Sequence, residues 1–431
     1  MKRAIALSGG GTKGSYEVGV WKALLEQKMD YQIVTGTSIG SINGAFMVTK
    51  RYDRAYELWN TIKMEDMMED GINLTETLEG ILEQKEAIRP FLKKYVKNKG
   101  ADISPYTAFV ERMIDEQAVR DSEIDYGLVT VQFPSLKGIE ITKKEIPKGM
   151  LKEYILASSA IFPLFPMHKI GTDTYLDGCY YDNLPIDFAL KMGADEVIAV
   201  DLRNTPAHPN YINRPYVTYI KPSRSLGTMM NFDHQLLLDN MQMGYYDAMK
   251  VFGKYKGFVF TFEKFDTSVW EAKMEEYSSY IAKAEAVFSE SNLKKLVKPG
   301  DVGNAFLELE TPLSAGKRTR EDYFIRGAEL AGGVFGLDAG KLYKFSDFLK
   351  ELYESLLARE VCDGADIFLK KSRRSMIAKI ADWKVNKDSI YITSCIYYAL
   401  EEKKIDSYEK VSLLTVLPKE LLVAVFLFVC S

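Results

Sequence analysis

The stretch QIVTGTSIGSINGAFMVTK, residues 32–50, contains an apolar run, a glycine-bearing turn and a helical pattern in direct succession. The apolar run predicts a short buried strand, and the residues after Ser38 predict a helix. Between them, Gly36, Ser38 and Gly40 fit the pattern G-x-S-x-G, in which a serine stands on a sharp turn and the next N–H, that of Ile39, lies near the site. Because this pattern requires a strand before the turn and a helix after it, Ser38 is a candidate nucleophile.

A similar strand–turn–helix unit precedes this one. Residues 3–8, RAIALS, predict a buried strand, and residues 13–28 predict a helix with apolar side chains at helical spacing. The order strand, helix, strand, helix is typical of a parallel sheet with helices on its faces. The loop SGGGTKG at 8–14 leaves backbone N–H groups uncovered at the beginning of a helix, where they favour an anion. That anion is either a bound phosphate or a transient oxyanion.

The same glycines also partly fit nucleotide-binding loops. Gly9, Gly11 and Gly14 nearly meet the dinucleotide pattern G-x-G-x-x-G. However, the acidic residue expected about 20 residues later falls at Asp30, before the second strand instead of at its end. The phosphate-loop pattern fails because no Gly-Lys-Ser/Thr follows at the required spacing. A non-catalytic module that binds phosphate or a nucleotide therefore stays open as an alternative.

Alternating strands and helices continue to about residue 262, and helical patterns replace them afterwards. The sequence thus predicts an α/β fold with a mainly parallel central sheet and helices on both faces, followed by an all-α C-terminal domain of unknown role. We expect domains at 1–262 and 263–431, with 51–120 as a candidate helical cap whose methionines suit an acyl chain. The remaining expected elements are strands at 127–133, 138–142, 216–220 and 257–262, a helix at 151–166, a turn-rich segment at 175–186 and a helix–turn–strand unit at 187–202.

Composition argues against several classes of protein. The 431 residues carry a net charge of −4, which disfavours a dedicated nucleic-acid binder. The four cysteines form no C-x-x-C pair and the three histidines no H-x-x-H pair, so neither a metal site nor a disulfide scaffold is expected. We expect no cofactor. The start MKRAIALSGGG lacks the apolar run of a signal peptide, and a cytoplasmic chain is the expectation.

Two features bear on membranes. The apolar stretch LLVAVFLFVC at 421–430 is too short to span a bilayer, which takes about 20 residues, and a buried last helix is favoured over a tail that touches a membrane. Basic clusters at 92–100, 143–152 and 368–375 either form solvated helix surfaces or meet anionic lipid headgroups. Transient peripheral contact with a membrane is therefore left open, as is the oligomeric state.

A serine nucleophile needs a base to accept its proton. Asp177 stands between the apolar run TYL and Gly178, a pairing that by itself is typical of a turn. His168 and His234 are the other candidates, and a histidine-assisted hydrolase stays open from the residues alone.

The order of these motifs resembles the patatin-like phospholipases. The glycine loop of that family, G-G-G-x-R/K-G, is matched by Gly9, Gly10, Gly11, Lys13 and Gly14, and its serine motif by Gly36, Ser38 and Gly40. The stretches ASSAIFPLFP at 157–166 and DNLPI at 182–186, with Asn183, are also similar. The family's aspartate motif, Asp-Gly-Gly or Asp-Gly-Ala, is matched by Asp177 and Gly178, although Cys179 holds its third place. The resemblance covers about residues 3–262.

The resemblance implies a function for these residues. In that family a Ser–Asp dyad without a histidine acts on lipid acyl esters, which implies Ser38 as nucleophile, Asp177 as base and the N–H groups of Gly10 and Gly11 as the oxyanion site. The implied partner is a phospholipid or a related lipid ester. A lipid acyltransferase, in which an alcohol replaces water, has the same residues and stays open.

Overall fold

The chain divides into two units, Met1–Phe252 and Gly253–Ser431. The computed structural model describes residues 1–68, 102–290, 309, 319–358, 383, 386–402, 405, 413 and 417–431. The expected domain boundary at residue 262 falls inside the second unit. The middle of the candidate cap, 69–101, and the basic clusters at 92–100 and 368–375 lie outside the described residues.

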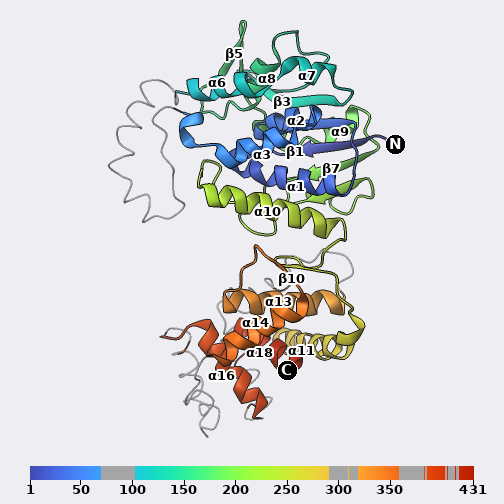
Figure 1. Ribbon diagram of the computed structural model, residues 1–431, viewed down its shortest axis with the longest axis vertical. Helices are drawn as coiled ribbons and strands as arrows, with labels where there is room; N and C mark the ends of the chain where they lie inside the picture. Colours follow the sequence, from blue (N-terminus) through green and yellow to red (C-terminus); the bar gives the residue numbers. More distant parts are fainter. Residues whose placement is uncertain are drawn as a thin grey trace. The chain divides into compact units, whose positions relative to one another are not determined.

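The first unit is built on an eight-stranded sheet in the order β5-β6-β3-β2-β1-β7-β8, with β4 paired to β3 (Figure 1). The five strands from β3 to β8 in this order are parallel, whereas β4 and β6 run antiparallel to β3, and β5 runs antiparallel to β6. The mainly parallel α/β sheet is therefore confirmed. The strands are β1 Arg3–Leu7, β2 Ile33–Thr37, β3 Asp125–Phe133, β4 Lys137–Thr142, β5 His168–Ile170, β6 Asp173–Asp177, β7 Glu196–Val200 and β8 Val217–Ile220.

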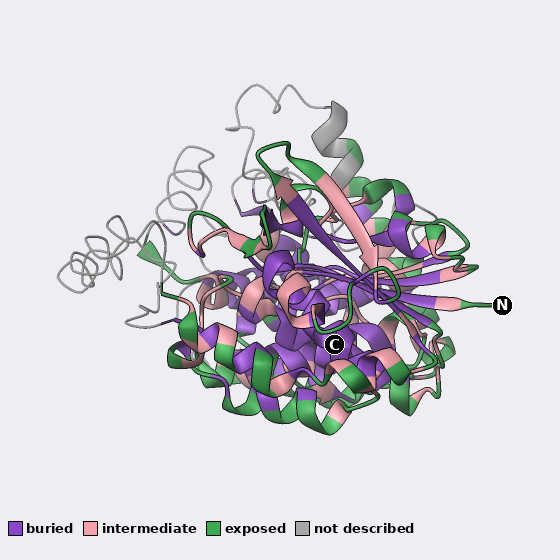
Figure 2. Cartoon of the chain, turned by 90° about the horizontal axis from the view of Figure 1, so that it is seen from above, coloured by how far each residue is buried: buried purple, intermediate pink, exposed green. Residues whose placement is uncertain are grey.

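Helices cover both faces of this sheet. On one face, Ala4 and Ala6 of β1 pack with Ile186 and Ala189 of the helix α9. On the other face, Gly44 of α2 lies against Val34 and Tyr126. The α-helices of the unit are α1 Ser15–Glu26, α2 Ile39–Val48, α3 Tyr52–Thr61, α6 Ser104–Met113, α7 Glu116–Asp121, α8 Leu151–Ser158, α9 Ile186–Lys191 and α10 His234–Val251, and the short 3-10 helices are η1 Gly11–Gly14, η2 Met64–Asp66, η3 Gly178–Tyr180 and η4 Pro209–Tyr211. The central strands are buried throughout (Figure 2).

Two elements differ from the sequence expectation. The turn-rich segment 175–186 begins with β6, which the antiparallel pairing with β3 holds in place. The helix expected over 151–166 ends at Ser158. Pro163 and Pro166 follow, and proline removes a helical N–H and disfavours helix in the residue before it.

The pairing of α10 with α1 was not predicted from the sequence. The two helices lie side by side (Figure 1). A Cβ at Gly19 would lie 1.8 Å from the Met241 carbonyl oxygen, and one at Gly244 would lie 2.0 Å from that of Tyr16. The two helix backbones can therefore come this close only because both positions are glycine. The hydrophobic periodicity of neither segment predicts this contact.

The second unit is predominantly helical. Its elements are η5 Ser268–Trp270, α11 Glu271–Glu290, α13 Arg320–Phe335, α14 Phe345–Leu357, α16 Ser389–Glu401 and α18 Pro418–Cys430, with a short parallel pair of strands, β9 Thr261–Phe262 and β10 Leu342–Tyr343. The pair of strands is a departure from the expected all-α domain. The last strand expected from the sequence, 257–262, supplies β9.

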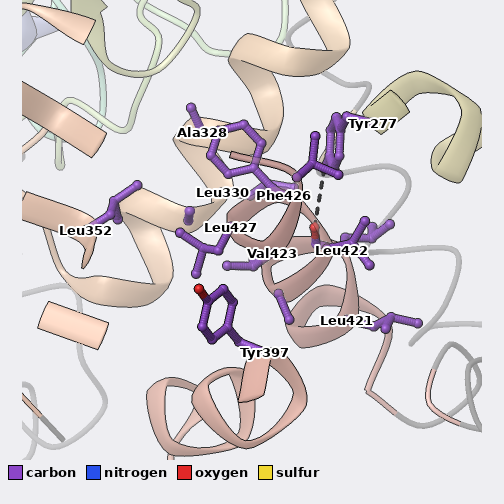
Figure 3. Packing of buried hydrophobic residues seen from close by; sticks show 14 of the residues in the cluster. Tyr277, Ala328, Leu330, Leu352, Tyr397, Leu421, Leu422, Val423, Phe426 and Leu427 are labelled. Atoms are coloured by element: carbon purple, nitrogen blue, oxygen red, sulfur yellow. Dashed lines mark hydrogen bonds between the residues drawn. The ribbon is translucent and has the colours of Figure 1, made fainter. Parts of the chain in front are cut away.

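The apolar C-terminal stretch is the core of this unit. Helix α18 packs through Val423, Phe426 and Leu427 against residues of α11, α13 and α14 (Figure 3). The Tyr277 hydroxyl donates a hydrogen bond to the Leu422 carbonyl oxygen at 3.4 Å. The favoured interpretation of 421–430 as a buried last helix is confirmed. Among the described helices, none has the length and apolar character needed to span a bilayer.

A buried carboxylate fixes the start of the second unit. One oxygen of Glu329, on α13, accepts hydrogen bonds from the N–H groups of Phe258, Val259 and Phe260 at 2.6, 2.8 and 3.0 Å. Its other oxygen pairs with the buried guanidinium of Arg326. Both oxygens of this carboxylate thus accept hydrogen bonds, which anchor the turn before β9 to α13.

Candidate active site

Ser38 stands on a strained turn between β2 and α2. Its backbone lies at φ 54°, ψ −123°, a region that side-chain-bearing residues rarely adopt. The turn closes because its flanks are bare: a Cβ at Gly36 would lie 2.2 Å from the Gly40 carbonyl oxygen, and one at Gly40 would lie 2.6 Å from that of Leu7. The strand–turn–helix context expected for G-x-S-x-G is therefore present. The conformation of this turn places the Ser38 side chain beyond the carboxyl end of β2.

The glycine loop lies beside this turn. Gly11 adopts φ +59°, and a Cβ there would lie 2.2 Å from the Met229 carbonyl oxygen, so only glycine fits. Among the described hydrogen bonds, the amides of Gly10 and Gly11 are not donors, as expected for the first N–H groups of a helix. Asn183 fixes the loop by donating to Ser8 Oγ at 2.9 Å and to the Gly9 carbonyl oxygen at 3.1 Å. The two amides are thus held available for an anion.

Asp177 ends β6 and faces the same place. Its Oδ1 accepts a hydrogen bond from the N–H of Cys179 at 2.8 Å. The Ser38 hydroxyl and the Cys179 thiol lie close enough to this carboxyl group to lower its pKa. Gly178 permits this position, because a Cβ there would lie 2.3 Å from the Val129 carbonyl oxygen.

Burial sets the electrostatics of this carboxyl group. Asp177 is 1% exposed, and in the described part of the chain no ion pair reaches it. Desolvation raises the pKa of Asp177 from 3.8 to about 6, and the hydrogen bonds from Cys179 and Ser38 oppose that rise. A carboxylate with this pKa is a stronger base than an ordinary aspartate at neutral pH.

One short segment at the end of α8, residues 158–160, holds both β2 and β6 at the site. The Ser38 N–H donates to Ser158 Oγ at 2.9 Å, and that hydroxyl donates in turn to the Val129 carbonyl oxygen at 2.7 Å. Two residues on, the Ala160 carbonyl oxygen accepts from the Asp177 N–H at 2.9 Å. The relative position of Ser38 and Asp177 therefore depends on residues 158–160.

Ser38 and Asp177 line a cavity of about 300 Å³. Polar groups gather at one end of it, with Gly9, Gly10, Gly11, Lys13, Ile39 and Asn183 around the two side chains. The rest of the lining is mostly apolar: Trp59, Ile62, Met67, Tyr106, Ile161, Phe165, Leu202, Met229, Met230 and Phe232. Such a cavity suits a substrate with a polar reacting group and an apolar body.

The candidate residues thus fall into two sets. The two reactive side chains and most of the glycine loop line the cavity, whereas Gly14, Gly36, Gly40 and Gly178 support it through backbone packing. None of the three histidines is among the lining residues of the described cavity. His168 instead contacts Glu153 Oε2 at 2.7 Å, and His208 contacts Asp182 Oδ1 at 3.0 Å. The geometry gives no role to His168 or His234 as the base.

Sequence reasoning missed the residues that support the site from elsewhere in the chain. Buried Glu17 accepts from Asn43 Nδ2 at 2.7 Å, and the same nitrogen donates to the Gly14 carbonyl oxygen at 2.9 Å. Asn43 Oδ1 accepts from Trp59 Nε1 at 3.1 Å, which fixes one wall of the cavity. Burial raises the pKa of Glu17 well above its ordinary value. Ser158 lies inside a quoted motif, but its contact with Ser38 required the tertiary structure.

Comparison with known proteins gives a family match for most of the first unit. Residues 5–190 match the family described as Patatin-like phospholipase. A mouse protein, Patatin-like phospholipase domain-containing protein 6, is 28% identical over 201 residues, which is 46% of this chain and 13% of that protein. Lysophospholipase nte1 of Aspergillus fumigatus is 28% identical over 211 residues, 47% of this chain and 12% of that protein. The chain thus matches only a small part of these relatives' length.

Among solved structures, VipD from Legionella pneumophila is similar with a TM-score of 0.36 and 12% identity, over 99% of this chain and 90% of that chain. This likeness is too weak to support an argument about the site. The assignment depends instead on the sequence match over 5–190, which contains the glycine loop, the serine turn and Asp177. Residues 5–190 of this chain are thus similar to the patatin-like phospholipase family.

Proposed function

We propose that the first unit hydrolyses the carboxylic ester bonds of phospholipids or related lipids through an acyl-serine intermediate. The observation that carries the proposal is that Ser38, on its strained turn, and the buried Asp177 line the same largely apolar cavity, with the Ser38 hydroxyl close enough to Asp177 to lower its pKa. The family match supports lipid esters as the substrate class.

In the first half-reaction, the Ser38 oxygen attacks the ester carbonyl carbon while its proton passes to Asp177. The carbonyl oxygen becomes an oxyanion that accepts hydrogen bonds from the N–H groups of Gly10 and Gly11. Donors of this kind each contribute about 10²–10³-fold to kcat. The ester C–O bond then breaks, and Asp177 returns the proton to the departing alcohol oxygen, which leaves an acyl-serine.

In the second half-reaction, water attacks the acyl carbon and gives its proton to Asp177. The Ser38 C–O bond breaks, the proton returns to the serine oxygen, and the fatty acid leaves. Burial supports both steps, because a carboxyl group whose pKa is about 6 both accepts and returns a proton near neutral pH.

The test compares Ser38→Ala and Asp177→Asn with wild type on a soluble ester, p-nitrophenyl butyrate, and on a panel of phospholipids. Each variant should lose about 10⁴-fold or more of kcat/KM. Ser135→Ala and Asp173→Asn, which replace exposed residues outside the cavity, are the matched controls and should keep full activity. Retention of turnover by either site variant would refute the dyad.

A fluorophosphonate probe separates this proposal from the non-catalytic alternative. An activated serine is labelled covalently at Ser38, and Asp177→Asn should suppress that labelling. A serine that only contributes to phosphate binding would stay unlabelled in wild type.

A further inference from the structure

Several exposed apolar side chains lie close to the cavity in the first unit. We call this set the apolar rim: Phe133, Leu136, Phe162, Tyr180, Tyr181 and Met229, which are 41%, 62%, 37%, 52%, 54% and 42% exposed. Apolar side chains exposed singly are ordinary, whereas a contiguous group marks an interaction surface. The question is therefore whether these residues form one surface.

Direct contacts join the rim to the cavity. Ile161 and Cys179 line the cavity, and the residues that follow them, Phe162 and Tyr180, are exposed. The Tyr180 hydroxyl donates to the Phe162 carbonyl oxygen, so these two segments meet. Met229 both lines the cavity and is exposed, which places the cavity mouth within the rim.

Strand register brings the other members to the same place. The Tyr181 ring covers Gly138 of β4, since a Cβ there would lie 2.2 Å from the ring. Gly138 is paired with Val131, and Phe133, two residues further along β3, points to the same face of the sheet. Leu136 lies in the turn between these two strands.

This face also extends past the edge of the sheet at which β2 ends and Ser38 follows. Thr37, at the end of β2, is paired with Val129, and β3 continues past it from Thr130 to Phe133. The β3–β4 turn therefore projects on the side where β2 delivers Ser38. The rim and the cavity mouth share one edge of the unit.

One lysine on this face, Lys169, has no described ion-pair partner. Phe133 is in register with Thr174, and Thr174 with Lys169, so that Lys169 of β5 points to the same face. Lys169 is exposed, and no described residue pairs with it. Glu140, on the same face of β4, is paired with Lys191 at 2.7 Å.

We propose that the apolar rim is the surface through which this unit docks on a phospholipid bilayer, with the cavity mouth facing the lipid. The proposal rests on the proposed function, because a lipid ester must leave the bilayer to reach Ser38. Phenylalanine and tyrosine suit the boundary between acyl chains and headgroups, since each has a large apolar ring and tyrosine adds a polar end. The unpaired Lys169 favours the phosphate layer of the same surface.

The basic cluster expected at 143–152 is a weaker candidate for this contact. Lys143 is buried and donates to the carbonyl oxygens of Val119, Ser122 and Ile124. Lys144 pairs with Asp125 at 2.8 Å, and Lys152 donates to the Glu111 carbonyl oxygen at 2.7 Å. These lysines have partners inside the protein.

The test uses the full chain and the double variant Phe133→Thr/Leu136→Asn. Threonine keeps the β-propensity of the strand, and asparagine tolerates the positive φ of 55° at residue 136. Leu25→Gln and Leu357→Gln replace leucines of similar exposure outside the rim and are the matched controls. Binding is measured by flotation with phosphatidylcholine vesicles, with and without phosphatidylserine, and catalysis by turnover of p-nitrophenyl butyrate in solution.

Wild type and both controls should float with vesicles. The double variant should bind roughly tenfold more weakly or worse, as expected for the loss of two apolar side chains that docking would bury in the bilayer. Its turnover of the soluble ester should equal that of wild type. Absence of vesicle binding in wild type, equal binding by the double variant, or a rim that instead joins two copies of the chain would each overturn the proposal. Failure of the proposed function is seen separately, as absent turnover of the soluble ester in a protein that still floats.

Discussion

Each of the two units buries a carboxylate, and the two carboxylates differ in the hydrogen-bond donors and cations around them. Glu329 has three backbone N–H groups on one oxygen and the Arg326 guanidinium on the other. Asp177 is equally buried, but its carboxylate accepts a hydrogen bond from one backbone N–H, that of Cys179, and among the described residues no cation forms an ion pair with it.

The difference separates a structural carboxylate from one suited to chemistry. A buried carboxylate that accepts from donors on both oxygens fixes the backbone around it. A buried charge with few donors retains basicity, and its ionised form costs the fold stability. Substitutions at the two positions should therefore have opposite effects on activity and on stability.

The largest effect is expected from Asp177→Asn. Activity on p-nitrophenyl butyrate should fall about 10⁴-fold, while the free energy of unfolding at neutral pH should rise. The change in pKa from 3.8 to about 6 corresponds to an upper value of about 3 kcal/mol, at 1.36 kcal/mol per pKa unit. The measurement is chemical denaturation of variant and wild type at neutral pH.

The sign follows from proton binding. Since the folded protein holds the Asp177 proton more tightly than the unfolded chain, the contribution of Asp177 to stability is fully present below the unfolded pKa and is lost as the pH rises through about 6. Asp177→Asn should remove this loss. A variant that is less stable than wild type at every pH would contradict the comparison.

Glu329→Ala should act in the reverse direction. It leaves a buried Arg326 charge and three N–H groups without their acceptor, so the second unit should lose about 3–5 kcal/mol of stability. The protein that remains folded should keep the kcat of wild type on the soluble ester, because Glu329 is outside the described cavity. Thermal unfolding and active-site titration with a fluorophosphonate give the two numbers. Glu354→Ala, an exposed substitution in the same unit, is the control.

A smaller effect on catalysis is expected from Ser158→Ala. The change removes the acceptor of the Ser38 N–H and releases the strained turn, which should lower kcat by roughly 100-fold with little change in KM. Ser159→Ala, which loses a hydroxyl bonded to the Ile155 carbonyl oxygen, is the neighbouring control. Ser158→Cys restores a weak acceptor and should recover part of the activity. A KM effect alone would indicate that Ser158 shapes the cavity without positioning Ser38.

The smallest effect concerns pH. Because Asp177 must be ionised to accept a proton, kcat/KM should rise with pH through a limb near pH 6. The Cys179 side chain lowers the pKa of Asp177, so Cys179→Ala should move the limb to higher pH. Groups that face Asp177 from other elements are Tyr106 of α6 and Ser38, with Lys13 and Arg203 also lining the cavity. A limb that stays in place would show that the thiol does not tune the base.

Local sequence patterns predicted the strands, helices and turns that are determined by residues close together in the sequence. The strands β1, β2 and β3 and the helices α1 and α2 follow from hydrophobic periodicity, and the bare glycines around Ser38 follow from the turn that they permit. The motif order was also enough to nominate Ser38 and Asp177, although their roles remain proposals.

Tertiary contacts supplied the rest. The backbone approach of Gly19 to Met241 depends on a helix more than two hundred residues away, and no pattern within α1 indicates it. The same is true of Ser158, whose hydroxyl meets Ser38 across 120 residues of sequence. The strand β6 exists through its pairing with β3, and its apolar run of three residues was too short to predict a strand from the sequence.

Residues 158–160, at the end of α8, hold both β2 and β6 in place, and this has a consequence for heat inactivation. The end of a helix is where a folded chain opens first. Fraying at Ser158 would at once free the turn of Ser38 and, through Ala160, the strand of Asp177. Warming should therefore abolish the proposed ester hydrolysis reversibly at temperatures where the sheet and the second unit are still intact.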